Sequence, residues 1–225
     1  AGRFHVRNLA SDAEQPDRVN LLIEAGRAFG TGQHETTAGC LTMLDRMRRV
    51  GMRARNVADI GTGTGLLAFA ALNLWPHAHA IASDIDPVAV DISAGNAIAN
   101  GVKLGDRAGQ LALVTAAGAD HAAIIGRAPY DLLIANILAG PLIELAPSLC
   151  ALVEDGGTIL LAGLLDTQAD AVLAAYRAQG MRLAERTDRG DWPTLRLRKR
   201  PSIGWKRSRR LNPAARGEAP GFGSL

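Results

Sequence analysis

The chain has 225 residues, of which 48% are hydrophobic, and its mean hydropathy of +0.06 is typical of a globular protein with a substantial core. No apolar run approaches the roughly 20 residues that span a membrane, and residues 1–16 contain no apolar signal-peptide core, so we expect a cytoplasmic protein. Cys40 and Cys150 lie far apart within apolar patterns, which predicts two buried thiols, and no CxxC motif indicates a metal or redox site.

The net charge of +3 is unevenly distributed along the chain. Residues 196–225 contain nine Lys or Arg and one acid, Glu218, whereas the rest contains sixteen Lys or Arg and twenty-one Asp or Glu. The pI near 9.2 therefore comes from the tail and does not indicate a nucleic-acid-binding domain. The Arg-, Gly- and Pro-rich composition predicts a basic, disordered tail over residues 201–225, with weak contact to RNA as the alternative.

Residues 1–55 predict an N-terminal linker and lid segment, with a helix beginning in the stretch TTAGCLTMLDRM. Residues 56–200 then alternate between strand-like and helical patterns. We expect strands at 56–60, 78–84, 110–116, 130–136, 156–163, 181–189 and 192–200, and helices at 66–75, 88–100, 140–153 and 166–180. Pro147 predicts a kink or break in the third of these helices. The alternation predicts an α/β fold with a doubly wound, seven-stranded, mostly parallel sheet, Rossmann-like in form, whose last two strands pair with each other.

A glycine-rich loop, DIGTGTG (59–65), follows the first of these strands and precedes a helical pattern. Gly61, Gly63 and Gly65 allow a tight turn and close approach of the backbone to a ligand. Position 66 is leucine, so the GxGxxG fingerprint of dinucleotide-binding proteins is not met, and no GK[ST] indicates a P-loop. The loop therefore predicts a cofactor site of another kind, or a turn needed only for packing.

Two acids flank this loop in the predicted sheet. Asp84 closes the second strand, 23 residues after Gly61, where a carboxylate can accept hydrogen bonds from both hydroxyls of a ribose. Asp59 adds negative charge beside the loop, which favours a cationic ligand over a pyrophosphate. A ligand that combines a ribose, an ammonium group and a positive centre is S-adenosylmethionine.

Three motifs together resemble a known family. The glycine loop, SDIDP (83–87) and ANILAGPL (135–142) resemble class I S-adenosylmethionine-dependent methyltransferases, and AFGTGQHETT (28–37) resembles the PrmA family, which methylates ribosomal protein L11. The resemblance covers most of the chain, up to about Arg200. It implies that the chain is an enzyme that transfers methyl groups from S-adenosylmethionine to amino groups, of lysine side chains or the N-terminus, of ribosomal protein L11.

The resemblance also implies a set of site residues. Thr37, Gly61, Gly63, Asp84 and Asn136 are expected to bind the cofactor. Asn136 is also the expected catalytic residue, because its side-chain oxygen can accept a hydrogen bond from an incoming amine. For Thr31 we favour a helix-capping role, and His34 is either a base or an oriented loop residue.

Several alternatives stay open at this point. Members of the family carry a small N-terminal recognition domain that this chain is expected to lack, so a methyltransferase for another protein or a small molecule is the runner-up. A nucleotide-binding module without transfer activity and an NAD dehydrogenase fit the loop and Asn136 less well. The histidines show no spacing typical of metal ligands, so no metal is expected.

Overall fold

The structure, a computed structural model, describes residues 1–8, 13–23 and 31–201, and side chains within residues 31–34 are not described. Its large sheet has the strand order β5-β4-β3-β6-β7-β9-β8, parallel except for β9, which is antiparallel to both of its neighbours. The strands are β3 (Asn56–Ile60), β4 (His79–Asp84), β5 (Leu111–Thr115), β6 (Tyr130–Asn136), β7 (Val153–Ala162), β8 (Met181–Arg189) and β9 (Trp192–Lys199). The predicted seven-stranded, mostly parallel sheet is confirmed, and so is the pairing of its last two strands.

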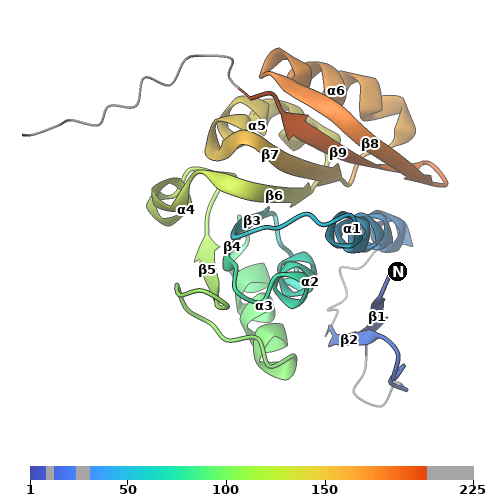
Figure 1. Cartoon of the computed structure of the whole chain (residues 1–225), viewed down its shortest axis with the longest axis vertical. Helices are drawn as coiled ribbons and strands as arrows, with labels where there is room; N and C mark the ends of the chain where they lie inside the picture. The colour runs from blue at the N-terminus through green and yellow to red at the C-terminus, as the bar shows by residue number, and fades with distance from the viewer. Residues whose placement is uncertain (9–12, 24–30, 202–225) are drawn as a thin grey trace, which may run out of the picture.

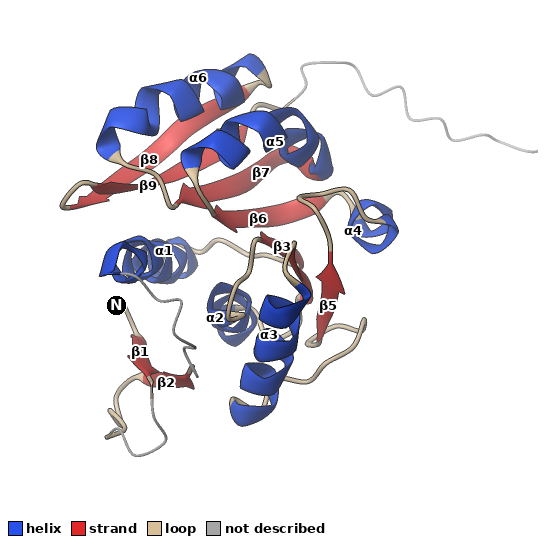
Figure 2. Ribbon diagram, turned by 180° about the vertical axis from the view of Figure 1, so that it is seen from behind, coloured by secondary structure: helices blue, strands red, loops and turns tan. Residues whose placement is uncertain are grey.

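Helices cover both faces of this sheet (Figures 1 and 2). On one face lie α1 (Thr31–Arg49), α2 (Leu66–Leu74) and α3 (Pro87–Ala99), and on the other α4 (Ala122–Arg127), α5 (Ala139–Leu152) and α6 (Ala169–Ala178). Alternate residues of β6 enter the two cores: Leu132 and Ile134 pack on the α1–α2 side, Leu133 and Ala135 on the α5–α6 side. Burial on both faces explains why the central residues of β6, 132–135, are all apolar.

The strand order places a switch point between β3 and β6. After β3 the chain passes outward through β4 and β5, and then returns to form β6 on the other side of β3. In parallel sheets of this kind ligands bind beyond the carboxyl ends of the strands at such a point. The loop that follows β3 and Asn136 at the end of β6 therefore meet there.

Some elements differ from the sequence prediction. A parallel ribbon of β1 (Phe4–Arg7) and β2 (Val19–Leu22) was not predicted, and its residues Phe4 and Leu21 join the core around α1 and α2. Of the kink or break predicted at Pro147, the break is wrong, because α5 continues through that residue. Its buried side chains Leu142, Ala146 and Leu149 hold the helix on the sheet, which offsets the backbone hydrogen bond that proline cannot donate. The predicted disordered tail lies outside the described residues.

Both cysteines are buried thiols, as predicted. Among the described residues, no helix is long and apolar enough to cross a membrane.

Candidate functional site

The loop after β3, residues 61–65, is fixed to the end of β4 by backbone hydrogen bonds. The amides of Gly61 and Thr62 both donate to the carbonyl of Ser83, at 2.8 and 2.9 Å. Gly61, Gly63 and Gly65 all have positive φ, a region that other residues adopt only at a cost. A Cβ atom on Gly63 would meet nothing within 4 Å, so open space lies beside this glycine. The loop therefore presents accessible backbone at Gly63, where a ligand can approach closely.

Asp84, at the end of β4, is held by the same loop. Its Oδ2 accepts a hydrogen bond from the Gly63 amide at 2.8 Å, and its Oδ1 accepts one from the Asp86 amide at 3.1 Å. An ionised carboxylate has about four acceptor positions, so this half-buried group can still accept from a pair of hydroxyls. Asp86 caps α3, because its side chain accepts a hydrogen bond from the Val88 amide at 2.9 Å.

Two polar residues of α3 support the loop from the side, and sequence analysis missed them. Ser93 Oγ donates to the Gly63 carbonyl at 2.8 Å, and Asn96 Nδ2 donates to the Thr64 carbonyl at 3.0 Å. Both side chains are buried. The available signal was their spacing of three residues within a mostly apolar helix, which places them on one face.

Asp59 lies beneath the loop and is only 1% exposed. Its Oδ2 accepts a hydrogen bond from Thr62 Oγ1 at 2.6 Å, while its Oδ1 has no hydrogen-bond partner within the described part of the chain. Burial raises the pKa of this carboxyl to about 6, so it is still mostly ionised at neutral pH. A buried carboxylate with one unpaired oxygen favours a cationic group nearby.

Asn136 and Thr37, which are 99 residues apart in sequence, meet in the structure. The Asn136 side chain Nδ2 donates to Thr37 Oγ1 at 3.4 Å. Thr37 lies in the second turn of α1, and α1 packs against β6, β7 and β9, which brings it to the carboxyl edge of the sheet. With the amide nitrogen directed at Thr37, the Asn136 oxygen is the atom that can accept a hydrogen bond from a third group.

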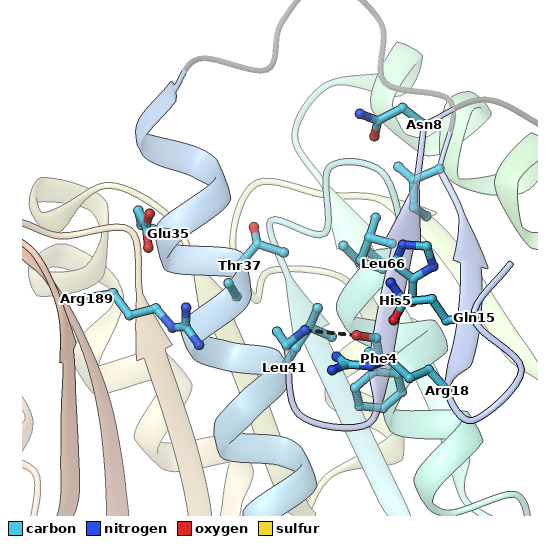
Figure 3. Close-up of a pocket in the computed structure, with 14 residues that line it drawn as sticks. Phe4, His5, Asn8, Gln15, Arg18, Glu35, Thr37, Leu41, Leu66 and Arg189 are labelled. Carbon is cyan, nitrogen blue, oxygen red and sulfur yellow. Dashed lines mark hydrogen bonds between the residues drawn. The ribbon is translucent and has the colours of Figure 1, made fainter. Parts of the chain in front are cut away.

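A cavity of about 420 Å³ opens beside Thr37. Thr37 and Leu41 line it from α1, Leu66 from the first turn of α2, and His5 from β1 (Figure 3). The unpredicted ribbon thus forms one wall of a space whose opposite side is lined by Thr37 and Leu41 of α1. A molecule bound at Thr37 can extend into this cavity.

These groups fit S-adenosylmethionine. The Asp84 carboxylate suits the hydroxyls of a ribose, and the unpaired Asp59 oxygen adds negative charge beside a cation. Ile85, next in the chain, is 72% exposed and offers an apolar surface to a flat ring. Within the described residues, no three His, Cys, Asp or Glu side chains gather as they would around a metal ion.

The sequence pattern of one protein family, Ribosomal protein L11 methyltransferase (PrmA), matches residues 1–200 of this chain. This chain belongs to that family. A ribosomal protein L11 methyltransferase of Agrobacterium fabrum is 44% identical over 200 residues, which cover 88% of this chain and 66% of the relative. The ribosomal protein L11 methyltransferase of Brucella suis is 43% identical over 199 residues, 88% of this chain and 67% of the relative. The chain therefore spans about two thirds of the length of these curated relatives.

Solved structures agree with the family. A crystal structure from Lactobacillus delbrueckii subsp. bulgaricus, described as ribosomal protein L11 methylase, matches with a TM-score of 0.74 and 25% identity, over 88% of this chain and 95% of that one. A methyltransferase from Pyrococcus furiosus, with a TM-score of 0.59 and 14% identity over 80% and 89% of the two chains, shares the fold. The sheet is a class I methyltransferase fold, and S-adenosylmethionine is the methyl donor of the family.

The structure thus places all five predicted site residues at one edge of the sheet. Asp84 contacts Gly63, and Asn136 contacts Thr37. Gly61 differs from the expectation in one respect: a Cβ atom there would overlap the Cγ2 methyl of Ile137, so packing also requires this glycine. α1 begins at Thr31, before the stretch in which the helix was expected to start, so the prediction of His34 as a loop residue is wrong. The side chains of Thr31 and His34 lie outside the described residues, so capping by Thr31 and a base role for His34 stay predictions.

Proposed function

We propose that this chain transfers methyl groups from S-adenosylmethionine to amino groups of ribosomal protein L11, on lysine side chains, the N-terminal amine or both. The contact between Asn136 and Thr37, beside the glycine loop, is the observation that carries the proposal. It leaves an amide oxygen directed away from Thr37 at the edge of the cofactor site. The names of the relatives support L11 as the substrate.

We infer that Thr37, Gly61, Gly63, Asp84 and Asn136 hold the cofactor. The Asp84 carboxylate accepts hydrogen bonds from the ribose, and the open side of Gly63 lets the ligand approach the backbone. Thr37 and the cavity beside it receive the amino-acid end of the ligand.

The reaction itself needs alignment more than activation. Bound S-adenosylmethionine supplies an electrophilic methyl group on a sulfonium. Asn136 Oδ1 accepts a hydrogen bond from the neutral amine and so directs the nitrogen lone pair toward that methyl group. Positioning of this kind is worth up to roughly 7–11 kcal/mol.

The amine must lose its proton before it can attack. A lysine with an ordinary pKa of about 10.4 is almost fully protonated at neutral pH, and transfer into a site shielded from water lowers that pKa. We assign no general base, and the proton leaves to solvent.

The decisive test is mass spectrometry of purified ribosomal protein L11, at saturating concentration, after incubation with this chain and S-adenosylmethionine. We expect mass increases in steps of one methyl group, and peptide mapping then identifies the amines. Asn136→Ala is the matched control, because turnover should fall by about 100-fold while S-adenosylhomocysteine binding, measured by calorimetry, should weaken much less. Cofactor binding without any mass gain by the wild-type chain would contradict L11 as the substrate and favour another protein or a small molecule.

A further inference from the structure

Ile137, the residue after Asn136, is held between two glycines from neighbouring strand ends. Gly61 follows β3 and Gly163 follows β7, on either side of β6. Ile137 is half-buried and packs against the core on the α5–α6 side. We call these three residues the Ile137 clamp.

The two glycines contact different parts of Ile137. A Cβ atom on Gly163 would lie 2.5, 2.8 and 2.9 Å from the carbonyl oxygen, carbonyl carbon and nitrogen of Ile137. Those are backbone atoms, which cannot rotate away as a side chain can. On the other side, a Cβ atom on Gly61 would overlap the Ile137 Cγ2 methyl. The backbone of Ile137 therefore rests against Gly163, and its side chain rests against the cofactor loop.

This packing fixes Asn136 as well. The nitrogen of Ile137 is bonded to the carbonyl carbon of Asn136, and Asn136 pairs with Ala162, the residue before Gly163, in the β6–β7 ladder. A shift of Ile137 away from Gly163 therefore moves the backbone that carries the Asn136 side chain. A misplacement of about 1 Å near reacting groups can reduce turnover by about 100-fold.

We propose that Ile137 is a positioning residue, which sets the place of the Asn136 amide relative to the cofactor loop. The inference rests on the proposed catalytic role of Asn136. The Gly163 contact fixes the backbone beneath Asn136, and the Cγ2 contact with Gly61 ties that backbone to the loop that binds the cofactor.

The chain offers matched variants for each contact. Gly163 and Gly180 have nearly the same φ, +85° and +82°, but a Cβ atom on Gly180 would meet nothing within 4 Å. Gly163→Ala and Gly180→Ala thus share the backbone strain, and only the first pushes on Ile137. Ile137→Val keeps both γ-carbons and therefore the contact with Gly61. Ile137→Ala removes both γ-carbons and with them this contact.

Two readouts separate positioning from general destabilisation. The first is kcat for methylation of ribosomal protein L11, set beside KM for S-adenosylmethionine. The second is the side-chain amide signal of Asn136 in ¹H–¹⁵N spectra without substrate, assigned by its loss in Asn136→Ala. We expect Gly163→Ala and Ile137→Ala to shift this signal and to lower kcat by at least about tenfold, with KM changed by less than about twofold. Gly180→Ala and Ile137→Val should behave as the wild type.

An unshifted Asn136 signal, with kcat of Gly163→Ala equal to that of Gly180→Ala, would overturn the proposal. If Gly163→Ala does not fold, the Asn136 signal and kcat of Ile137→Ala, compared with those of Ile137→Val, test the proposal. Full turnover in Asn136→Ala would instead remove the catalytic role proposed above, and the amide signal would still report whether the clamp holds this side chain.

Discussion

Gly39→Ala in the middle of α1 should destabilise the protein, although alanine is the better helix former. In an open helix this change stabilises by about 1 kcal/mol. Here the new Cβ atom would overlap Thr194 Oγ1 and lie 3.3 Å from Thr194 Cβ, within the buried contact between α1 and β9. Overpacking of a core contact costs about 1–3 kcal/mol.

Because the new Cβ atom would overlap Thr194 Oγ1 directly, we take the upper part of that cost, about 2–3 kcal/mol. After the helix-propensity gain of about 1 kcal/mol, the free energy of unfolding should fall by about 1–2 kcal/mol, which lowers Tm by roughly 2–8 °C in a domain of this size. Thr194→Ala in the same chain should restore most of the loss, because it removes the overlapping oxygen and leaves only a tight methyl contact. Thr194→Val should not restore it, because a methyl group then occupies the place of that oxygen. By itself Thr194→Val should be nearly neutral, since Oγ1 has no hydrogen-bond partner among the described residues.

Urea unfolding followed by circular dichroism measures these differences. The control is Gly95→Ala in α3, an exposed helical glycine whose Cβ atom would meet nothing within 4 Å. It should stabilise the protein by up to about 1 kcal/mol. If Gly39→Ala were as stable as Gly95→Ala, or if Thr194→Val rescued it as well as Thr194→Ala, the packing argument would be refuted.

Three further predictions follow from single contacts. Burial raises the pKa of Asp59 from 3.8 to about 6, so the folded state binds this proton more tightly than the unfolded state and stability falls as pH rises from about 4 to about 6. Asp59→Asn should remove this pH dependence in urea unfolding and raise the free energy of unfolding at pH 7 by up to about 3 kcal/mol. Asp84→Ala should weaken S-adenosylhomocysteine binding by about 10- to 100-fold in calorimetry, and unchanged affinity would reject the ribose contact. Lys199 Nζ donates to the carbonyls of Cys150 and Val153, at 2.8 and 2.7 Å. Lys199→Met should therefore lower the free energy of unfolding by about 1–2 kcal/mol. The control, Lys103→Met at an exposed position, should change stability little.

The sequence predicted much of the candidate site because its signals are local. The loop DIGTGTG, the acid at the end of the next strand and Asn136 after an apolar run each stand at a strand end. Parallel strands bring their carboxyl ends to one edge, so the alternation of strands and helices was enough to place these residues together. The family pattern then supplied Thr37, which no local signal distinguished from a helix-capping threonine.

The remaining features depend on contacts between distant segments. The β1–β2 ribbon is short, and it forms because Phe4 and Leu21 find a core supplied by α1 and α2. In the same way, α5 passes through Pro147 because packing on the sheet outweighs a lost hydrogen bond.

From the sequence alone we could predict the seven-stranded sheet and a set of candidate cofactor-site residues, since hydrophobic periodicity and turn residues act over a few positions. The folded structure was needed to show that Asp59 is buried with one unpaired oxygen, that Ser93 and Asn96 hold the loop, and that Ile137 lies between Gly61 and Gly163. These are matters of close packing between side chains far apart in the chain, where distances of a few tenths of an ångström decide the outcome.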